Sequence, residues 1–147
     1  MLLTEFDANR QAIINPEDLN EPLEGFPKIA VSCFSRSTFQ RMLEMFPHEL
    51  IYETSMANVA IPIYKLVIDE QELALFNAPV GASACVAILE DIFALGTDKL
   101  VLFGTCGVLD KDIKETSIII PSHALRDEGT SFHYVEASDE IAVNVGV

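Results

Sequence analysis

The strongest constraint on the fold comes from residues 78–104, where a helical pattern of apolar residues runs directly into a short apolar strand pattern. The apolar stripe of the predicted helix consists of Cys85, Leu89, Ile92 and Phe93. Glu90 and Asp91 lie off this stripe, and Gly96 stands where a C-terminal cap belongs. Residues 98–104 then have the composition of a buried strand. A helix between apolar strands is typical of an α/β sheet.

The same alternation recurs along the chain. Residues 28–35 predict a buried strand, and residues 37–47 predict a helix that ends at a proline. Residues 60–68 and 72–78 predict the two strands of a hairpin, because both are rich in β-branched, leucine and aromatic residues and a polar stretch separates them. Residues 115–125 predict a further strand. In such an α/β fold, ligands bind at the carboxyl ends of the strands.

The first part of the chain lacks this periodicity. Three prolines, two asparagines and a glycine predict that residues 15–27 form an extended segment rather than a helix. We therefore divide the chain into an N-terminal arm, residues 1–27, and one α/β domain, residues 28–147. Ser138 predicts the cap of a helix that begins near the end of the given sequence.

Charge and cysteine content exclude several classes of function. A formal net charge of −14 over 147 residues makes nucleic acid and anionic membranes poor partners. Cys33, Cys85 and Cys106 show neither a Cys-x-x-Cys spacing nor a nearby histidine that would complete a metal site. They indicate reduced thiols in a cytoplasmic protein. The first ten residues lack a signal peptide's apolar run, and no stretch is apolar enough to span a bilayer.

The loop that follows the strand at 98–104 is a candidate anion site. Gly104, Thr105, Cys106 and Gly107 supply backbone N–H groups and one hydroxyl, which suit an oxyanion such as phosphate. The alternative is that the glycines only turn the chain. Cys106 lacks a base at a suitable spacing, which favours a small packed thiol over a nucleophile.

Residues 77–83 form a second candidate, because they lead into the predicted helix, whose N–H groups and dipole favour negative charge. The alternative is an ordinary helix start capped by Ser83. Residues 122–134 form a third, in which Arg126 and His133 could orient a polar ligand and Phe132 could stack on a planar one. Its alternative is a charged surface loop in which Arg126 pairs with acidic neighbours.

The order of these segments resembles the nucleoside phosphorylase family, which includes uridine phosphorylases and hexameric purine nucleoside phosphorylases. The resemblance is carried by "NAPVGASACVAILEDIFALGTDKLVLFGTCGVLDKDI" and "IIIPSHALRDEGTSFHY" and extends over residues 28–147. The shared features are a Gly-Ala loop, a helix, a strand ending in Gly-Thr/Ser-x-Gly, and a segment of the form Asp-(Glu)-Gly-x-Ser-x-His-aromatic. The resemblance implies a central mixed sheet with flanking helices.

The resemblance also implies a reaction: inorganic phosphate cleaves the N-glycosidic bond of a ribonucleoside, giving ribose 1-phosphate and free base, with no cofactor. It assigns phosphate binding to Thr105, Gly104, Gly107 and Gly81. It assigns nucleoside binding to Cys106, His133 and Arg126, and it identifies no catalytic residue. It further implies a homo-oligomer, a dimer or a hexamer.

Three features set this chain apart from the family pattern. Leu102 stands where many members carry an arginine. The sequence "CFSRST" stands in place of a Gly-Asp-Pro-x-x-Arg loop; its Arg36 is not at the position of the family's arginine and could replace it only by lying nearby in the folded chain. Family chains also extend further, so we expect a domain truncated after its first half to two-thirds. The segment "DEGTSFHY" resembles the matching segment of the uridine-preferring branch more than that of the purine branch, which implies a uridine-like substrate. The alternatives are a nucleosidase of the same superfamily, which uses water, and a non-catalytic truncated scaffold.

Overall fold

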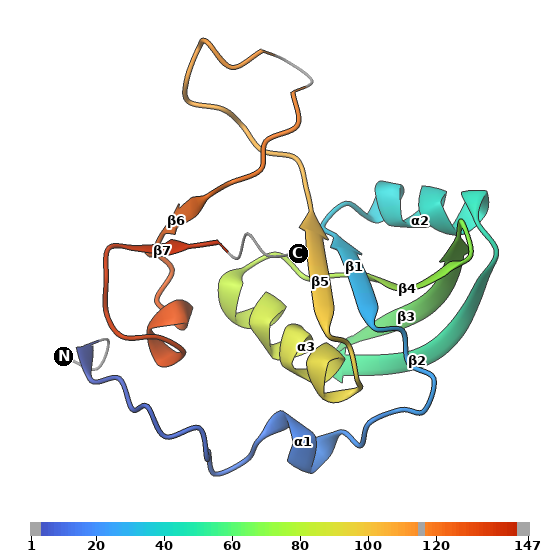
Figure 1. Ribbon diagram of the computed structural model, residues 1–147, viewed down its shortest axis with the longest axis horizontal. Helices are drawn as coiled ribbons and strands as arrows, with labels where there is room; N and C mark the ends of the chain where they lie inside the picture. Colours follow the sequence, from blue (N-terminus) through green and yellow to red (C-terminus); the bar gives the residue numbers. More distant parts are fainter. Residues whose placement is uncertain (1–3, 115–116, 144–147) are drawn as a thin grey trace. The chain divides into compact units, whose positions relative to one another are not determined.

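The computed structural model describes residues 4–114 and 117–143, and it divides into two compact units. We call residues 11–104 the sheet unit, and residues 1–10 with 105–147 the hairpin unit. Both units are traced in Figure 1. Each unit is described by itself.

The sheet unit is built on a five-stranded mixed sheet. Its elements are α1 (Pro16–Leu19), β1 (Ile29–Cys33), α2 (Arg36–Met45), β2 (His48–Met56), β3 (Val59–Ile68), β4 (Gln71–Asn77), α3 (Ala82–Ala94) and β5 (Lys99–Phe103). The strand order is β2-β3-β4-β1-β5. β1 runs parallel to both β4 and β5, whereas β2, β3 and β4 pair antiparallel. The predicted fold class, a mixed sheet with flanking helices, is confirmed.

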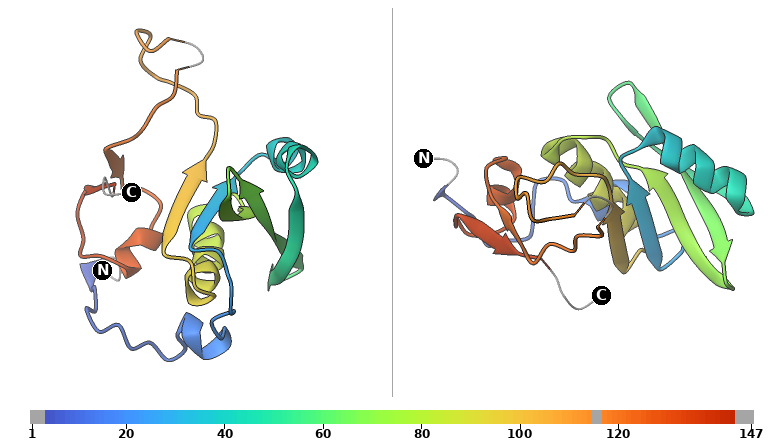
Figure 2. Two further views of the ribbon diagram at one scale, coloured as in Figure 1. Left: turned by 45° about the vertical axis from the view of Figure 1, so that its right-hand side comes forward. Right: turned by 90° about the horizontal axis from the view of Figure 1, so that it is seen from above.

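The two longer helices pack with alternate side chains of the sheet. In β4, Ala74 and Phe76 belong to the core cluster that contains the buried side of α3, whereas Leu75 belongs to the cluster that contains Phe39 and Leu43 of α2. Because successive strand residues point to opposite faces, α2 and α3 cover opposite faces of the sheet. The sheet is strongly twisted, so β2 and β3 run at a large angle to β1 and β5 (Figure 2).

Both predicted helices of this unit are present, with one correction at a helix start. Ser35 caps α2, since its Oγ accepts a hydrogen bond of 3.2 Å from the backbone N–H of Thr38. α3 begins instead at Gly81, whose φ of +115° favours glycine, so the prediction that Ser83 is the cap was wrong. Gly96, at φ +122°, follows α3 as expected of a C-terminal cap.

Two expectations about burial in the sheet unit were wrong. Phe93 is 46% exposed, because the buried stripe of α3 runs through Cys85, Ile88 and Ile92. β5 is present, but Val101, Leu102 and Phe103 are 44–55% exposed. In the described sheet β5 is an edge strand that pairs with β1, which explains why its apolar composition does not translate into burial.

The predicted hairpin at 60–78 is confirmed as β3 and β4, and β2 extends it to three antiparallel strands. β2 was not anticipated from the sequence. Asp69 and Glu70, in the tight turn between β3 and β4, both have positive φ, at +49° and +67°. This backbone conformation favours glycine or asparagine, so the turn carries local strain.

A polar cluster joins α1 to the rest of the sheet unit. Asp91 of α3 accepts hydrogen bonds from Asn20 Nδ2 at 2.8 Å and from Thr54 Oγ1 at 2.6 Å. The Tyr52 hydroxyl donates to Asn20 Oδ1 at 3.5 Å. The prediction that residues 15–27 are extended was wrong for α1, which is one short helical turn. The polar cluster attaches the residue after this turn, Asn20, to α3.

The hairpin unit contains β6 (His123–Leu125), the 3-10 helix η2 (Thr130–His133) and β7 (Glu140–Ala142). β6 pairs antiparallel with β7. The strand predicted over residues 115–125 is wrong for residues 117–122, and residues 115 and 116 lie outside the described residues. The helix predicted from Ser138 is also wrong, because β7 follows it. None of the helices within residues 4–114 and 117–143 has the length and apolarity needed to cross a bilayer.

Candidate functional site

Three strands of the sheet unit end at one edge. β1 is parallel to its two neighbours, and its last residue, Cys33, pairs with Asn77 of β4 and with Phe103 of β5. The carboxyl ends of β1, β4 and β5 therefore lie side by side, and the arrowheads of β1 and β5 can be followed to this edge in Figure 1. This is the edge at which open α/β sheets bind ligands.

Two helices begin at the same edge. α2 starts three residues after the end of β1, and α3 starts five residues after the end of β4. The N-terminus of a helix presents backbone N–H groups and the positive end of its dipole. The Gly81 cap of α3 has no side chain to accept from these groups, and a Cβ added there would meet nothing within 4 Å. An anion at this edge would face two helix N-termini.

Hydrogen bonds hold the β1 and β4 ends together. Asn77 Nδ2 donates to the carbonyl oxygen of Cys33 at 2.5 Å, and the N–H of Ala78 donates to Oγ of Ser32 at 3.0 Å. Ser32 and Ala78 are buried. The loops that lead to α2 and α3 consequently start from fixed positions, which favours a preformed site.

Gly104 follows β5 directly and lies close to the β1 loop. A Cβ added to Gly104 would come within 3.2 Å of Cδ2 of Phe34, tighter than an ordinary contact. A larger residue at this position requires the Phe34 ring to move. Gly104 therefore allows a close approach of the β5 end to the β1 loop.

Arg36 brings a positive charge to this edge, because it is the first residue of α2. It is exposed in the first turn of α2, directly after the Ser35 cap. A positive charge in this turn opposes the helix dipole, so the residue weakens the isolated helix. The same charge becomes favourable if an anion binds at the helix end.

The structure places the predicted phosphate ligands in both units. Gly81 and Gly104 lie at the edge described above, whereas Thr105 and Gly107 are exposed residues of the hairpin unit. Cys106, a predicted nucleoside ligand, lies between them in the chain and is also exposed. The roles of these residues in binding phosphate or nucleoside stay predictions.

The predicted nucleoside ligands Arg126 and His133 lie in the hairpin unit. His133 is exposed at the end of η2, whereas Arg126 is only 7% exposed. Its guanidinium donates to Ser131 Oγ at 2.9 Å and Ser138 Oγ at 2.9 Å, and to the carbonyl oxygens of Glu136 at 2.5 Å and Val135 at 3.1 Å.

Two further contacts complete the surroundings of this guanidinium. Arg126 Cζ lies 4.2 Å from the centroid of the Phe132 ring, a cation–π contact. Glu128 accepts from both the backbone N–H and the hydroxyl of Ser131. The hydroxyl and then the N–H of Ser131 lower the pKa of the Glu128 carboxyl, with lesser contributions from the Thr130 N–H and the charge of Arg126, and desolvation opposes them.

The three thiols differ in their surroundings. All three are free; Cys33 and Cys85 are buried, whereas Cys106 is exposed, so the prediction that Cys106 is a packed thiol was wrong. Burial raises the pKa of the Cys33 and Cys85 thiols, so both stay neutral at physiological pH. Within the part of the chain that the structure describes, no group of three His, Cys, Asp or Glu side chains is placed to hold a metal ion.

Comparisons with known proteins identify relatives of this arrangement. A family model described as the phosphorylase superfamily matches residues 28–145. A curated relative, guanosine phosphorylase of Halorubrum lacusprofundi, is 27% identical over 74 residues, which are 48% of this chain and 31% of that protein.

Two solved structures share the fold. Uridine phosphorylase from Vibrio fischeri ES114 matches with a TM-score of 0.67 and 18% identity, over 86% of this chain and 52% of that one. The same enzyme in complex with 6-hydroxy-1-naphthoic acid matches with a TM-score of 0.68 and 17% identity, over 82% and 51%. The chain thus spans about a third of its curated relative and about half of these solved structures.

Proposed function

We propose that this chain, which belongs to the phosphorylase superfamily, provides the phosphate-binding part of a site that cleaves the N-glycosidic bond of a ribonucleoside. In this reaction the bond between ribose and base breaks and a bond from phosphate oxygen to the anomeric carbon forms. The products are ribose 1-phosphate and free base. Inorganic phosphate is the co-substrate, and the reaction needs no cofactor.

The observation that carries the proposal is the shared edge of β1, β4 and β5, from which α2 and α3 begin. As the glycosidic bond breaks, positive charge develops on the ribose, and an anion fixed beside it stabilises that charge. The two helix N-termini and Arg36 supply the attraction for phosphate, Gly81 leaves the start of α3 free of a side chain, and Gly104 lets the end of β5 approach the β1 loop closely. In the proposal, Thr105 and Gly107 extend this site, and Cys106 and His133 contact the nucleoside.

Two nucleosides are the first candidate substrates. The segment "DEGTSFHY" favours a uridine-like nucleoside, and the name of the curated relative adds guanosine. Both nucleosides are therefore included in the test below.

The reduced cysteines favour a cytoplasmic location.

A nucleosidase is the second candidate function. Leu102, where many phosphorylases carry an arginine, is an exposed apolar residue of β5 and supplies no charge. A site with fewer cations binds phosphate more weakly, because charge-assisted hydrogen bonds are the strong ones. Water would then replace phosphate as the nucleophile.

The test measures base release from uridine, guanosine, inosine and adenosine, with and without phosphate. Release that depends on phosphate supports the phosphorylase, and equal release without phosphate identifies a nucleosidase. A folded chain that releases no base but binds phosphate is a scaffold that keeps the anion site without the reaction. A folded chain with neither property contradicts the proposal.

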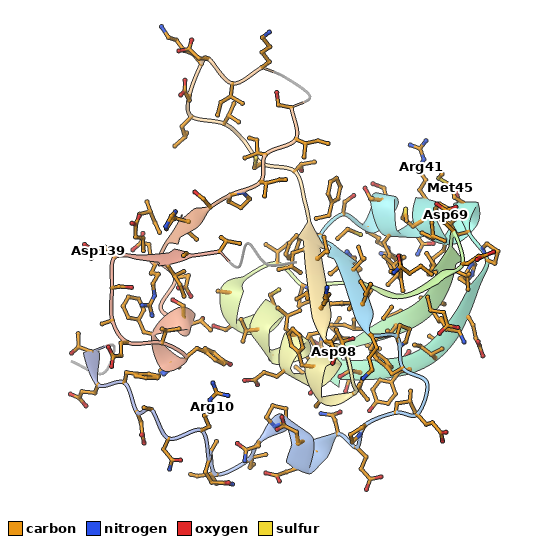
Figure 3. The ribbon with its side chains drawn as sticks, viewed as in Figure 1. Arg10, Arg41, Met45, Asp69, Asp98 and Asp139 are labelled. Atoms are coloured by element: carbon orange, nitrogen blue, oxygen red, sulfur yellow. The ribbon has the colours of Figure 1, made fainter. Side chains whose placement is uncertain are left out.

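Phosphate binding is measured separately by calorimetry. We expect Arg36→Gln and Thr105→Ala each to weaken phosphate binding by about tenfold, the loss of roughly one charge-assisted or hydroxyl hydrogen bond. Arg41→Gln is the matched control. Arg41 is an exposed arginine of the same helix, and Figure 3 shows its side chain pointing away from the sheet.

We also propose a homo-oligomer, with the exposed apolar residues of the 60–78 hairpin as part of the contact. Val67 of β3 is 43% exposed. Sedimentation velocity should show a dimer or a larger assembly, and Val67→Lys should weaken it. A monomeric wild-type chain would contradict this proposal.

A further inference from the structure

Arg126 combines burial with a full positive charge. Among the buried residues within 4–114 and 117–143 it is the only one with a formally charged side chain. A buried charge is costly unless hydrogen bonds replace its lost water. At least four of the five guanidinium N–H groups of Arg126 have acceptors in the hairpin unit.

The acceptors of Arg126 come from a short stretch of chain. They lie 5 to 12 residues away, in segments on either side of Tyr134. Two of them are backbone carbonyls, of Val135 and Glu136, that lie outside any helix or strand. These carbonyls would otherwise need water or another donor, so the guanidinium selects the conformation in which they converge.

The same guanidinium connects to η2 from its other side. Nε donates to Ser131 Oγ, and that serine is held by the carboxylate of Glu128. The Phe132 ring covers the guanidinium plane at 4.2 Å. Arg126 thus contacts both η2 and the stretch that follows it, and its backbone N–H also pairs with the carbonyl of Asp139 at 2.9 Å.

We infer that Arg126 is a positioning residue: its guanidinium fixes residues 127–138 around itself and so sets the place of His133, instead of contacting the nucleoside. The functional half of this inference rests on the proposed function, and the structural half does not. It replaces the direct role that the sequence resemblance implies for Arg126.

The geometry requires arginine rather than any cation. The four acceptors are reached from three different nitrogens, Nε and the two terminal ones. A lysine has a single nitrogen on a flexible stem and cannot donate in this planar arrangement, nor stack flat on Phe132. Arg126→Lys therefore keeps the charge and loses the arrangement.

The first measurement is amide hydrogen exchange by NMR on the full chain. It compares wild type with Arg126→Lys, Arg126→Ala, and Arg41→Lys as the matched control on α2. The informative amides are those of Tyr134 and Val135, which both donate to the carbonyl oxygen of Ser131. Amides of α3 report whether the sheet unit stays folded.

We expect both Arg126 variants to exchange at least about tenfold faster at the informative amides, with α3 unchanged. Millimolar methylguanidinium should restore slow exchange in Arg126→Ala, because it supplies the missing group without the chain. Unchanged exchange in both variants would overturn the inference. Equal acceleration in α3 would also overturn it, since the effect would then be general unfolding.

The second measurement follows the His133 ring resonances during titration with uridine or guanosine. We expect the His133 resonances to respond more weakly to nucleoside in Arg126→Ala. If methylguanidinium restores both this response and slow amide exchange, the result supports the role of Arg126 in positioning His133. A weaker response with normal exchange means direct contact and overturns the inference. If wild type shows no response, the proposed nucleoside function fails, while the exchange experiment still decides whether Arg126 orders its segment.

Discussion

The polar cluster around Asp91 allows a quantitative prediction of the stability of the sheet unit. Asp91→Ala removes the acceptor of two hydrogen bonds, from Asn20 Nδ2 and Thr54 Oγ1. Asn20 and Thr54 are 9% and 7% exposed, so neither donor easily finds water in the variant. The Asn20 bond also joins the residue that follows α1 to α3.

The expected loss follows from the two bonds. A hydrogen bond to a charged group contributes about 1.5–3 kcal/mol, and we take the lower end of that range, about 1.5 kcal/mol for each bond, because Asp91 is only half-buried. Alanine forms helix better than aspartate by about 0.5 kcal/mol, which offsets part of the loss. Asp91→Ala should therefore lower the free energy of unfolding by about 2–3 kcal/mol.

A double-mutant cycle isolates one of the two bonds. Thr54→Val removes the donor at nearly constant volume and should cost about 1–2 kcal/mol. If Oγ1 and the Asp91 carboxylate interact as the 2.6 Å distance indicates, the double variant is more stable than the sum of the single losses predicts. We expect a coupling energy of about 1 kcal/mol.

The assay is urea unfolding followed by circular dichroism at the helical band, since α2 and α3, the two long helices, belong to the sheet unit. With a slope of about 1.5 kcal/mol per molar urea, Asp91→Ala should lower the midpoint by roughly 1.5 M. Glu44→Ala, an exposed acid on α2, is the control and should change stability by less than about 0.5 kcal/mol. An Asp91→Ala midpoint equal to that of the control would refute the reasoning.

Three further predictions follow from local features. Glu70→Gly should raise the free energy of unfolding by up to about 1 kcal/mol, because Glu70 has a φ of +67° in the β3–β4 turn; urea unfolding that shows a loss would contradict this. Ellman's reagent at pH 7 should modify Cys106 quickly, whereas Cys85, whose pKa is raised by burial, should react only at high pH or after unfolding; equal rates would be the contrary result. The pKa of the Glu128 carboxyl is lower in the folded chain than in the unfolded chain. The stability that the Glu128 carboxylate gives to the hairpin unit is therefore present at neutral pH and is lost as the pH falls through the folded pKa. An NMR titration should show a higher Glu128 pKa in Ser131→Ala than in wild type.

The predictable part of the fold is the part whose apolar residues are buried. The helices α2 and α3 each bury one side, with apolar residues at helical spacing, whereas the central strands β1, β3 and β4 are short apolar runs that bury residues on both faces of the sheet. β2 was missed because it is an edge strand with mostly exposed or half-buried residues, and a register shift between Leu50 and Tyr52 breaks its alternation.

The opposite error occurred where apolar composition was taken for burial. Residues 117–122 are apolar and partly β-branched, yet they pair with no strand among the described residues, and Ile118 and Ile120 are each 88% exposed. A strand needs a partner for its backbone groups, and composition does not reveal which segment supplies one. In the hairpin unit only the short strands β6 and β7 pair among the described residues, and the segment between them contains the hydrogen-bond partners of Arg126, which have no regular spacing.

The candidate site shows why position along a motif and position in space differ. Arg36 does not stand at the position of the arginine in the related Gly-Asp-Pro-x-x-Arg loops, and its place in the sequence does not predict where its side chain lies. In the structure, β1 ends at Cys33 and α2 begins at Arg36, so a short turn brings this cation to the edge that Gly81 and Gly104 also border. What determines whether a cation can serve an anion site is the strand end it follows. For that reason the contrast between Arg36 and Arg41, two exposed arginines of one helix, tests the location of the site more directly than any motif.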